Sequence, residues 1–97
     1  MILHHIQSSS AQSAGLRLAL RYAAKQDALL ISGDATGSVL QASWQTKLDG
    51  KTVYFLDEDI QARGLTDMIA ARYPHAKLVD YRGWVALSLT FDKVITW

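Results

Sequence analysis

The sequence predicts an α/β fold: a single three-layer domain with about five mostly parallel strands and helices on both faces of the sheet. Five short apolar runs, several of them rich in β-branched and aromatic residues, recur along the 97 residues. Segments whose apolar residues have helical spacing lie between these runs. Such alternation with short connections joins strands through right-handed crossovers into a largely parallel sheet. No linker or internal repeat divides residues 1–97, so we expect one domain.

The clearest strand is the third, because residues 53–56 are four consecutive apolar residues, as in a strand that is covered on both faces. The first apolar run contains the pair His4 and His5, which makes it less regular, and Gly33 and Asp34 close the second run. Together the apolar runs place the strands at residues 2–6, 28–32, 53–56, 76–80 and 94–97.

The first helix is expected at residues 14–24, where apolar residues form two seams and basic residues recur every fourth position on the remaining side. Its apolar arc is wider than packing on a sheet requires, which indicates that a second face is also covered. In the last helix, Trp84, Leu87 and Phe91 share one face. The other helices are expected at residues 36–44, at residues 57–64, from Thr66 or Asp67 to Pro74, and after Asp80.

The composition excludes several classes of function. Ten basic and nine acidic residues give a net charge of +1, which argues against a protein dedicated to direct contact with nucleic acid. The absence of cysteine removes disulfides, thiolate metal sites and thiol nucleophiles. No apolar run approaches the ~18 residues of a membrane span, and the first residues do not have the features of a signal peptide. We therefore expect a cytoplasmic protein with no membrane contact and no cofactor.

Three acidic residues, Asp57, Glu58 and Asp59, directly follow the third strand, at the edge of the sheet where ligands and chemistry often lie. The position of Asp57 is similar to that of the phospho-acceptor in a receiver domain. A receiver also needs an acidic pair after the first strand, where this chain has histidines, and a lysine after the fifth strand. We therefore predict that Asp57 and Asp59 cap a helix and complement its dipole. This helix is expected to stop at Gly64, in a structural corner that also faces a partner.

A metal site built from His4, His5 and His75 is disfavoured by geometry. Adjacent residues on a strand point to opposite faces of the sheet, so His4 and His5 cannot both reach one ion. No cysteine and no Glu-x-x-His spacing supplements them. We expect one histidine to be partly buried and the other to line a surface or an interface.

The serine-rich first loop offers two other sites. Residues 8–10 precede a helix and could hold an anion, but the loop lacks the glycines of a phosphate loop, so capping by Ser10 or Ser13 is the better prediction. Ser8, His5 and Asp34 supply the residue types of a catalytic triad, but no nucleophile elbow accompanies them.

Three tryptophans are unusual in so small a domain. Trp97 has no chain after it in the sequence to cover it, and large aromatic residues at an edge often anchor interfaces. The alternative is that Trp97 and the two-sided first helix simply complete the core of the monomer. We favour an interface role.

Four strings of this sequence are distinctive, at residues 2–4, 56–65, 79–87 and 94–97, and the most specific of them runs from Glu58 to Leu65. In these strings the sequence resembles the TusB/DsrH family of small sulfur-relay subunits. The family signature residues, which are also possible interface residues, are Asp57, Glu58, Asp59, Arg63, Gly64, Asp80, Tyr81, Trp84 and Trp97.

The resemblance implies a DsrEFH-like domain that assembles with TusC- and TusD-like subunits into a heterohexamer, a dimer of trimers. Such complexes pass persulfide sulfur towards 2-thiolation of the tRNA wobble uridine, or serve sulfur oxidation in DsrEFH relatives. The active thiol belongs mainly to the TusD/DsrE partner. DsrH-type members carry a cysteine in the first helix, near Ala19 here, so this chain is similar to the TusB type.

Two functions follow from the sequence. The first is a non-catalytic structural subunit of a sulfurtransferase complex. The second is a small anion- or ligand-binding α/β enzyme that uses residues 8–10, Asp34 and Asp57 at the strand ends. Self-association of the isolated chain is compatible with the first, because related subunits share interface geometry.

Overall fold

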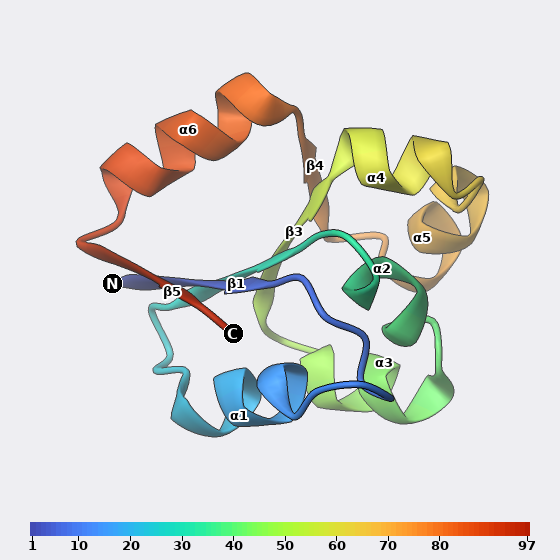
Figure 1. Cartoon of the computed structure of the whole chain (residues 1–97), viewed down its shortest axis with the longest axis horizontal. Coiled ribbons are helices and arrows are strands. Elements are labelled where there is room, and N and C mark those ends of the chain that lie inside the picture. The colour runs from blue at the N-terminus through green and yellow to red at the C-terminus, as the bar shows by residue number, and fades with distance from the viewer.

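The computed structural model describes residues 1–97 and contains one five-stranded sheet in which every neighbouring pair is parallel. The strand order is β4-β3-β2-β1-β5 (Figure 1), so the first strand lies inside the sheet and the last joins it from the other side. The strands are β1 (Ile2–Ile6), β2 (Ala28–Ile31), β3 (Thr52–Leu56), β4 (Lys77–Val79) and β5 (Lys93–Thr96). The predicted α/β fold is confirmed.

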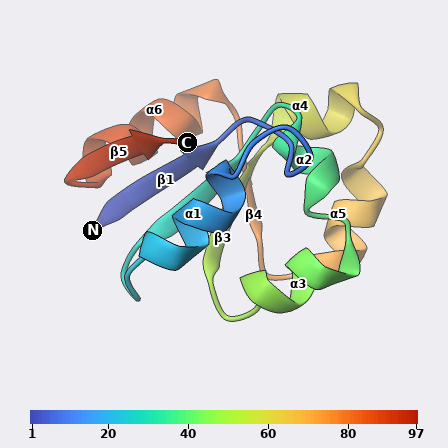
Figure 2. The same ribbon diagram turned by 60° about the horizontal axis from the view of Figure 1, so that its bottom comes forward.

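Helices cover both faces of this sheet, but unequally. Figure 1 shows α6 alone on one side and α1 and α3 on the other, and Figure 2 shows the same separation after rotation. The remaining helices, α2, α4 and α5, contribute buried residues to the same core as α1 and α3. The helices are α1 (Gly15–Tyr22), α2 (Ala35–Ser38), α3 (Ala42–Leu48), α4 (Asp57–Ala62), α5 (Thr66–Arg72) and α6 (Tyr81–Thr90).

The strand register explains why each face of the sheet carries a separate hydrophobic core. Successive side chains of a strand point to opposite faces, and pairing of Leu29 with Val53 and of Ile31 with Phe55 aligns large apolar residues on the α1 face. On the α6 face, Leu3, Ala28 and Leu30 form a smaller buried cluster. Trp84, Leu87 and Phe91 of α6 pack against that cluster, as their shared helical face predicts. No residue of α6 is itself fully buried.

The element boundaries differ from the prediction in one important place. The single helix expected at residues 36–44 is two helices, α2 and α3. Gln41 has an extended backbone, with φ −67° and ψ 137°, which breaks the helix. Gly37, a poor helix former, lies in the short α2. The chain itself covers the second seam of the first helix only in part, because Leu18 is half-buried but Tyr22 is 63% exposed.

None of the helices has the length and apolar character that a membrane span requires.

Candidate functional site

A cavity of about 270 Å³ lies at the carboxyl ends of β1, β2 and β3, between the sheet and the first turn of α6. His5, Leu30 and Leu56 line it from the sheet, and Tyr81 and Trp84 line it from α6. The rest of its wall comes from the loops after the strands and from α4, through Gln7, Ser32, Gly33 and Asp59. This is the edge of the sheet where parallel α/β folds usually hold ligands.

The polar centre of the cavity wall is the pair His5 and Ser32. His5 Nε2 and Ser32 Oγ are 2.7 Å apart, and the two residues are only 6% and 4% exposed. Burial lowers the pKa of His5 below its ordinary value of 6.5, while the nearby Asp59 carboxylate acts in the opposite direction. His5 is therefore neutral at pH 7, and its ring lies 5.6 Å from the Trp84 ring, centroid to centroid.

The acidic corner, formed by residues 57–59 at the start of α4, supports this wall from the side. The Asp59 carboxylate accepts a hydrogen bond of 2.7 Å from the Gly33 backbone N–H. Gly33 has a positive φ of 54°, and a Cβ there would lie 3.0 Å from the Gln7 carbonyl oxygen, so glycine is required. Arg63 donates to Asp34 at 3.2 Å and lies 3.9 Å from an Asp59 oxygen. The corner thus ties α4 to the loop after β2.

The prediction that Asp57 and Asp59 cap this helix is wrong. The residue before α4 is Leu56, and no side chain caps the helix there. Asp57, Glu58 and Asp59 instead occupy its first turn, where negative charge complements the helix dipole. Asp57 accepts a hydrogen bond from the Gln61 side chain one turn later, at 2.8 Å. Gly64 follows the helix with a positive φ of 65°, as expected of a residue that stops it.

The segment that begins with Asp80 positions the aromatic wall of the cavity. The Asp80 carboxylate caps α6 by accepting a 2.7 Å hydrogen bond from the Gly83 N–H. A Cβ on Gly83 would lie 3.0 Å from Val79 Cβ, so glycine lets α6 approach the end of β4 closely. Tyr81 and Trp84 lie on this first turn and face the cavity. The Trp84 Nε1–H is buried and has no acceptor in the protein.

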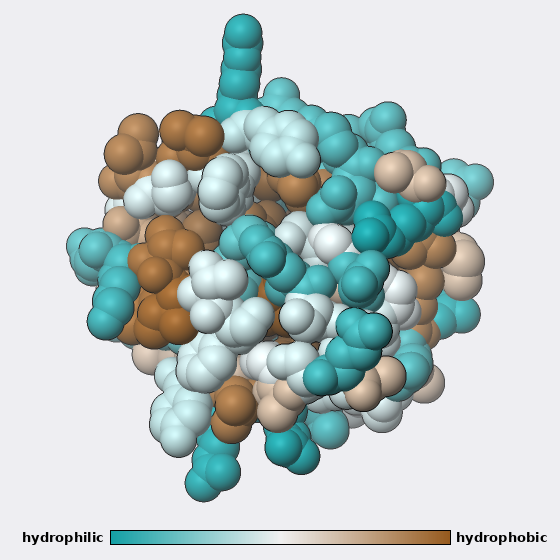
Figure 3. Space-filling view, viewed as in Figure 1, coloured by the Kyte–Doolittle hydropathy of each residue, from teal (hydrophilic) through white to brown (hydrophobic).

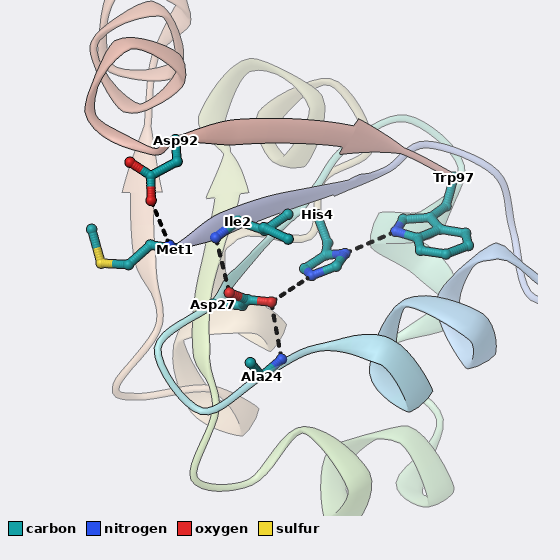
Figure 4. Close-up of polar contacts among 7 residues, drawn as sticks. All are labelled: Met1, Ile2, His4, Ala24, Asp27, Asp92 and Trp97. Carbon is teal, nitrogen blue, oxygen red and sulfur yellow. Dashed lines mark hydrogen bonds and ion pairs between the residues drawn. The ribbon is translucent and has the colours of Figure 1, made fainter.

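A second polar cluster lies on the opposite face of β1 (Figure 4). Asp27 accepts hydrogen bonds from the backbone N–H groups of Ile2 and Ala24, both at 2.9 Å, and lies 3.0 Å from His4 Nε2. The Trp97 Nε1–H donates to His4 Nδ1 at 3.0 Å. This cluster fastens the start of β1 and the end of β5 to the loop before β2.

The two histidines therefore point to opposite faces, as strand geometry predicts. Both are nearly buried, at 1% and 6% exposure, so neither lines the exposed surface of this chain, and the alternative that one of them lines an interface stays a prediction. His75 lines a different hollow, between α3 and α5 near the amino ends of β3 and β4. No group of three or more histidine, aspartate or glutamate side chains is arranged to hold a metal ion.

The other sequence-based sites are only partly assembled. The partner of His5 is Ser32, not Ser8, and Asp34 pairs with Arg63, so Ser8, His5 and Asp34 do not form a triad, in agreement with the missing nucleophile elbow. Ser13 Oγ accepts the Gly15 N–H at 3.0 Å at the start of α1, although the helix has no capping side chain at Ala14. Trp97 is half-buried and stacks on Tyr22 at 6.1 Å, so its interface role stays a prediction.

Sequence reasoning missed Asp27 and Ser32, which complete the two histidine clusters. A polar residue at the end of a buried strand, followed by a glycine that must turn, was the available signal for Ser32. Nothing in the local sequence distinguishes Asp27 from an ordinary loop acid.

Two comparisons bear on the identity of the chain. A model of the family described as "DsrH like protein" matches residues 8–94. No curated protein matched the chain in a sequence comparison. The family match spans the acidic corner, the first turn of α6 and the cavity wall except for His5 and Gln7, which precede the matched residues. On this evidence the chain belongs to the DsrH-like family.

Proposed function

We propose that this chain is a TusB-type, non-catalytic structural subunit of a sulfur-relay complex that supports 2-thiolation of the tRNA wobble uridine. Family membership supports a sulfur-relay-related role. The single observation that carries the non-catalytic role is the absence of any cysteine, because a persulfide carrier needs a thiolate. The thiol that moves the sulfur then belongs to a partner subunit.

The first helix supports the TusB type rather than a DsrH-like role in sulfur oxidation. Ala19, near the position where DsrH-type members have cysteine, is completely buried against the sheet. The chain therefore has no thiol on this helix that could carry sulfur. A contribution to the complex must come through its surface.

The surface of α6 supports assembly with TusC- and TusD-like subunits. Tyr81, Val85 and Leu89 follow one another at four-residue spacing and are 57%, 49% and 82% exposed. Residues with this spacing form a single stripe along a helix. Figure 3 shows hydrophobic surface over α6. An exposed apolar stripe of this kind is typical of a protein contact.

Assembly is tested by co-expression with TusC- and TusD-like subunits, followed by size-exclusion chromatography and native mass spectrometry. The expected species is a heterohexamer that contains two copies of this chain. Leu89→Glu should weaken assembly, whereas Met68→Glu, at an exposed apolar residue of α5, is the matched control. A chain that stays monomeric and never joins these partners would overturn the proposal.

The pathway is tested separately in the host. Deletion of the gene should reduce 2-thiouridine at the tRNA wobble position, measured by mass spectrometry of digested tRNA, and the unchanged chain should restore it. Normal thiolation in the deletion strain, together with impaired sulfur oxidation, would favour the DsrH-like role instead.

A further inference from the structure

The cavity under α6 has the features of a small-molecule site that the assembly role does not require. It combines a mostly apolar wall with a few convergent polar groups, as ligand pockets commonly do. Leu30 and Leu56 supply the apolar floor, and the His5–Ser32 pair supplies the polar centre. The exposed ring of Tyr81 stands beside Trp84 at the α6 side.

Trp84 carries a donor that the chain leaves without a partner. Its Nε1–H is buried, and no protein oxygen or nitrogen accepts from it. A buried donor without an acceptor raises the free energy of the protein. A bound molecule that supplies an acceptor removes this cost, which favours its binding. By contrast, the Nε1–H of Trp97 is paired with His4.

The wall that carries Trp84 has room to adjust. No residue of α6 is fully buried, and Gly83 follows the Asp80 cap by three residues. Nε1 itself has almost no accessible surface, so binding to it requires a small shift of α6 or a turn of the indole. The main core, which lies on the opposite face of the sheet, does not have to unpack for this movement.

The charges around the cavity select the class of ligand. His5 is neutral, and the only carboxylate in the wall belongs to Asp59, which already accepts the Gly33 N–H. No lysine or arginine lines the cavity. An anion is therefore disfavoured by Asp59, whose neighbour Arg63 lies 3.9 Å away but outside the cavity wall, whereas an ammonium ion has no acceptor to offer to Trp84.

We propose that this cavity binds a small uncharged molecule with a carbonyl-type acceptor, which takes the Trp84 Nε1–H while its apolar part contacts Leu30 and Leu56. This site does not depend on the proposed assembly, since the cavity is formed by one chain alone.

The test uses the ¹⁵N-labelled full chain and the indole N–H resonances of its three tryptophans, Trp44, Trp84 and Trp97. The separate variants Trp44→Phe and Trp97→Phe assign their own resonances, so Trp84 is identified without being changed. The probes are isobutyramide, isobutyrate and isobutylammonium, which have nearly the same shape but are neutral, anionic and cationic.

Isobutyramide should move the Trp84 resonance saturably to lower field, with a dissociation constant in the millimolar range expected for so few non-hydrogen atoms. Isobutyrate should bind at least about fivefold more weakly because of the Asp59 charge, and isobutylammonium should not produce this shift. The Trp44 and Trp97 resonances should remain in place.

Two results would overturn the proposal. One is a Trp84 resonance that shows no saturable response to isobutyramide, which would leave a bound water as the acceptor. The other is equal or tighter binding of the anion or the cation. As a further check, Trp84→Phe keeps the aromatic ring but removes the donor, and should weaken isobutyramide binding measured by saturation transfer to the probe.

Discussion

The indole Nε1–H of Trp97 donates a hydrogen bond of 3.0 Å to Nδ1 of His4, which is 1% exposed. This bond defines the tautomer of His4, because Nδ1 must be unprotonated to accept. The ring proton is then on Nε2, which donates to the Asp27 carboxylate at 3.0 Å. Trp97 and Asp27, which are far apart in the sequence, thus hold one buried ring from both sides.

Replacement of Trp97 by phenylalanine removes the donor but keeps an aromatic ring against Tyr22. His4 Nδ1 is then buried without a partner, so the free energy of unfolding should fall by about 1–3 kcal/mol. Urea unfolding followed by circular dichroism measures the change. Trp44→Phe, at a half-buried tryptophan under the Lys47 ammonium, should have a smaller effect. Equal losses in the two variants would show that the hydrogen bond adds nothing.

Replacement of Asp27 by asparagine tests the other side of His4. Burial of the Asp27 carboxylate opposes its charge, but hydrogen bonds from His4 and from the Ala24 and Ile2 N–H groups outweigh this effect and lower the pKa below 3.8. The side chain is 5% exposed, so we expect a loss of about 2 kcal/mol at pH 7.

The pH dependence provides a second measurement at Asp27. An aspartate with a lowered folded-state pKa stabilises the protein above the unfolded pKa, and this contribution is lost as pH falls through the folded pKa. The unchanged protein should therefore lose stability below about pH 4, and Asp27→Asn should lose less over the same range. Parallel acid unfolding curves for the two proteins would contradict the assignment.

The acidic corner gives a comparison between neighbours. Asp59→Ala removes the acceptor of the Gly33 N–H and the carboxylate beside Arg63, so it should cost about 1.5–3 kcal/mol. Asp57 holds the side chain of Gln61 on the surface of the helix and complements the helix dipole, so Asp57→Ala should cost about 0.5–1 kcal/mol. Urea unfolding of both variants decides this. A larger loss at Asp57 would restore the capping interpretation.

The sheet could be predicted because each strand is an apolar run that is identifiable without knowledge of its neighbours. The same is true of the opposite directions of His4 and His5, which follow from the period of a strand. The break between α2 and α3 was not predictable, because the apolar spacing continues past Gln41 while the backbone becomes extended.

The candidate site depends on pairings that the sequence does not state. His5 meets Ser32 only because β1 pairs in parallel with β2 in one particular register, with His5 opposite Leu30. Trp84 reaches His5 only because β5 lies beside β1, so that α6 crosses the sheet from β4. The order of strands in a sheet is set by the whole packing of the chain. For this reason the signature residues Asp59, Tyr81 and Trp84 were singled out without the cavity that they line.

His5 should titrate below an ordinary histidine, because burial disfavours its charged form more strongly than Asp59 favours it. A histidine with a lowered folded-state pKa contributes stability above the unfolded pKa of 6.5, and this contribution is lost as pH falls below that value. The protein should therefore be less stable at about pH 5.5 than at about pH 7.5, and His5→Gln should reduce the difference. The control is His75→Gln, which replaces an exposed histidine outside the cavity and is measured by urea unfolding at the same two pH values.

Asp59→Asn should lower the pKa of His5 further, by removing the charge that favours protonation. Proton–carbon correlation spectra of the His5 Cε1–H would follow this shift. A rise in the pKa of His5 in Asp59→Asn, or a His5 that titrates above 6.5 in the unchanged protein, would contradict the buried, neutral His5 on which the cavity depends.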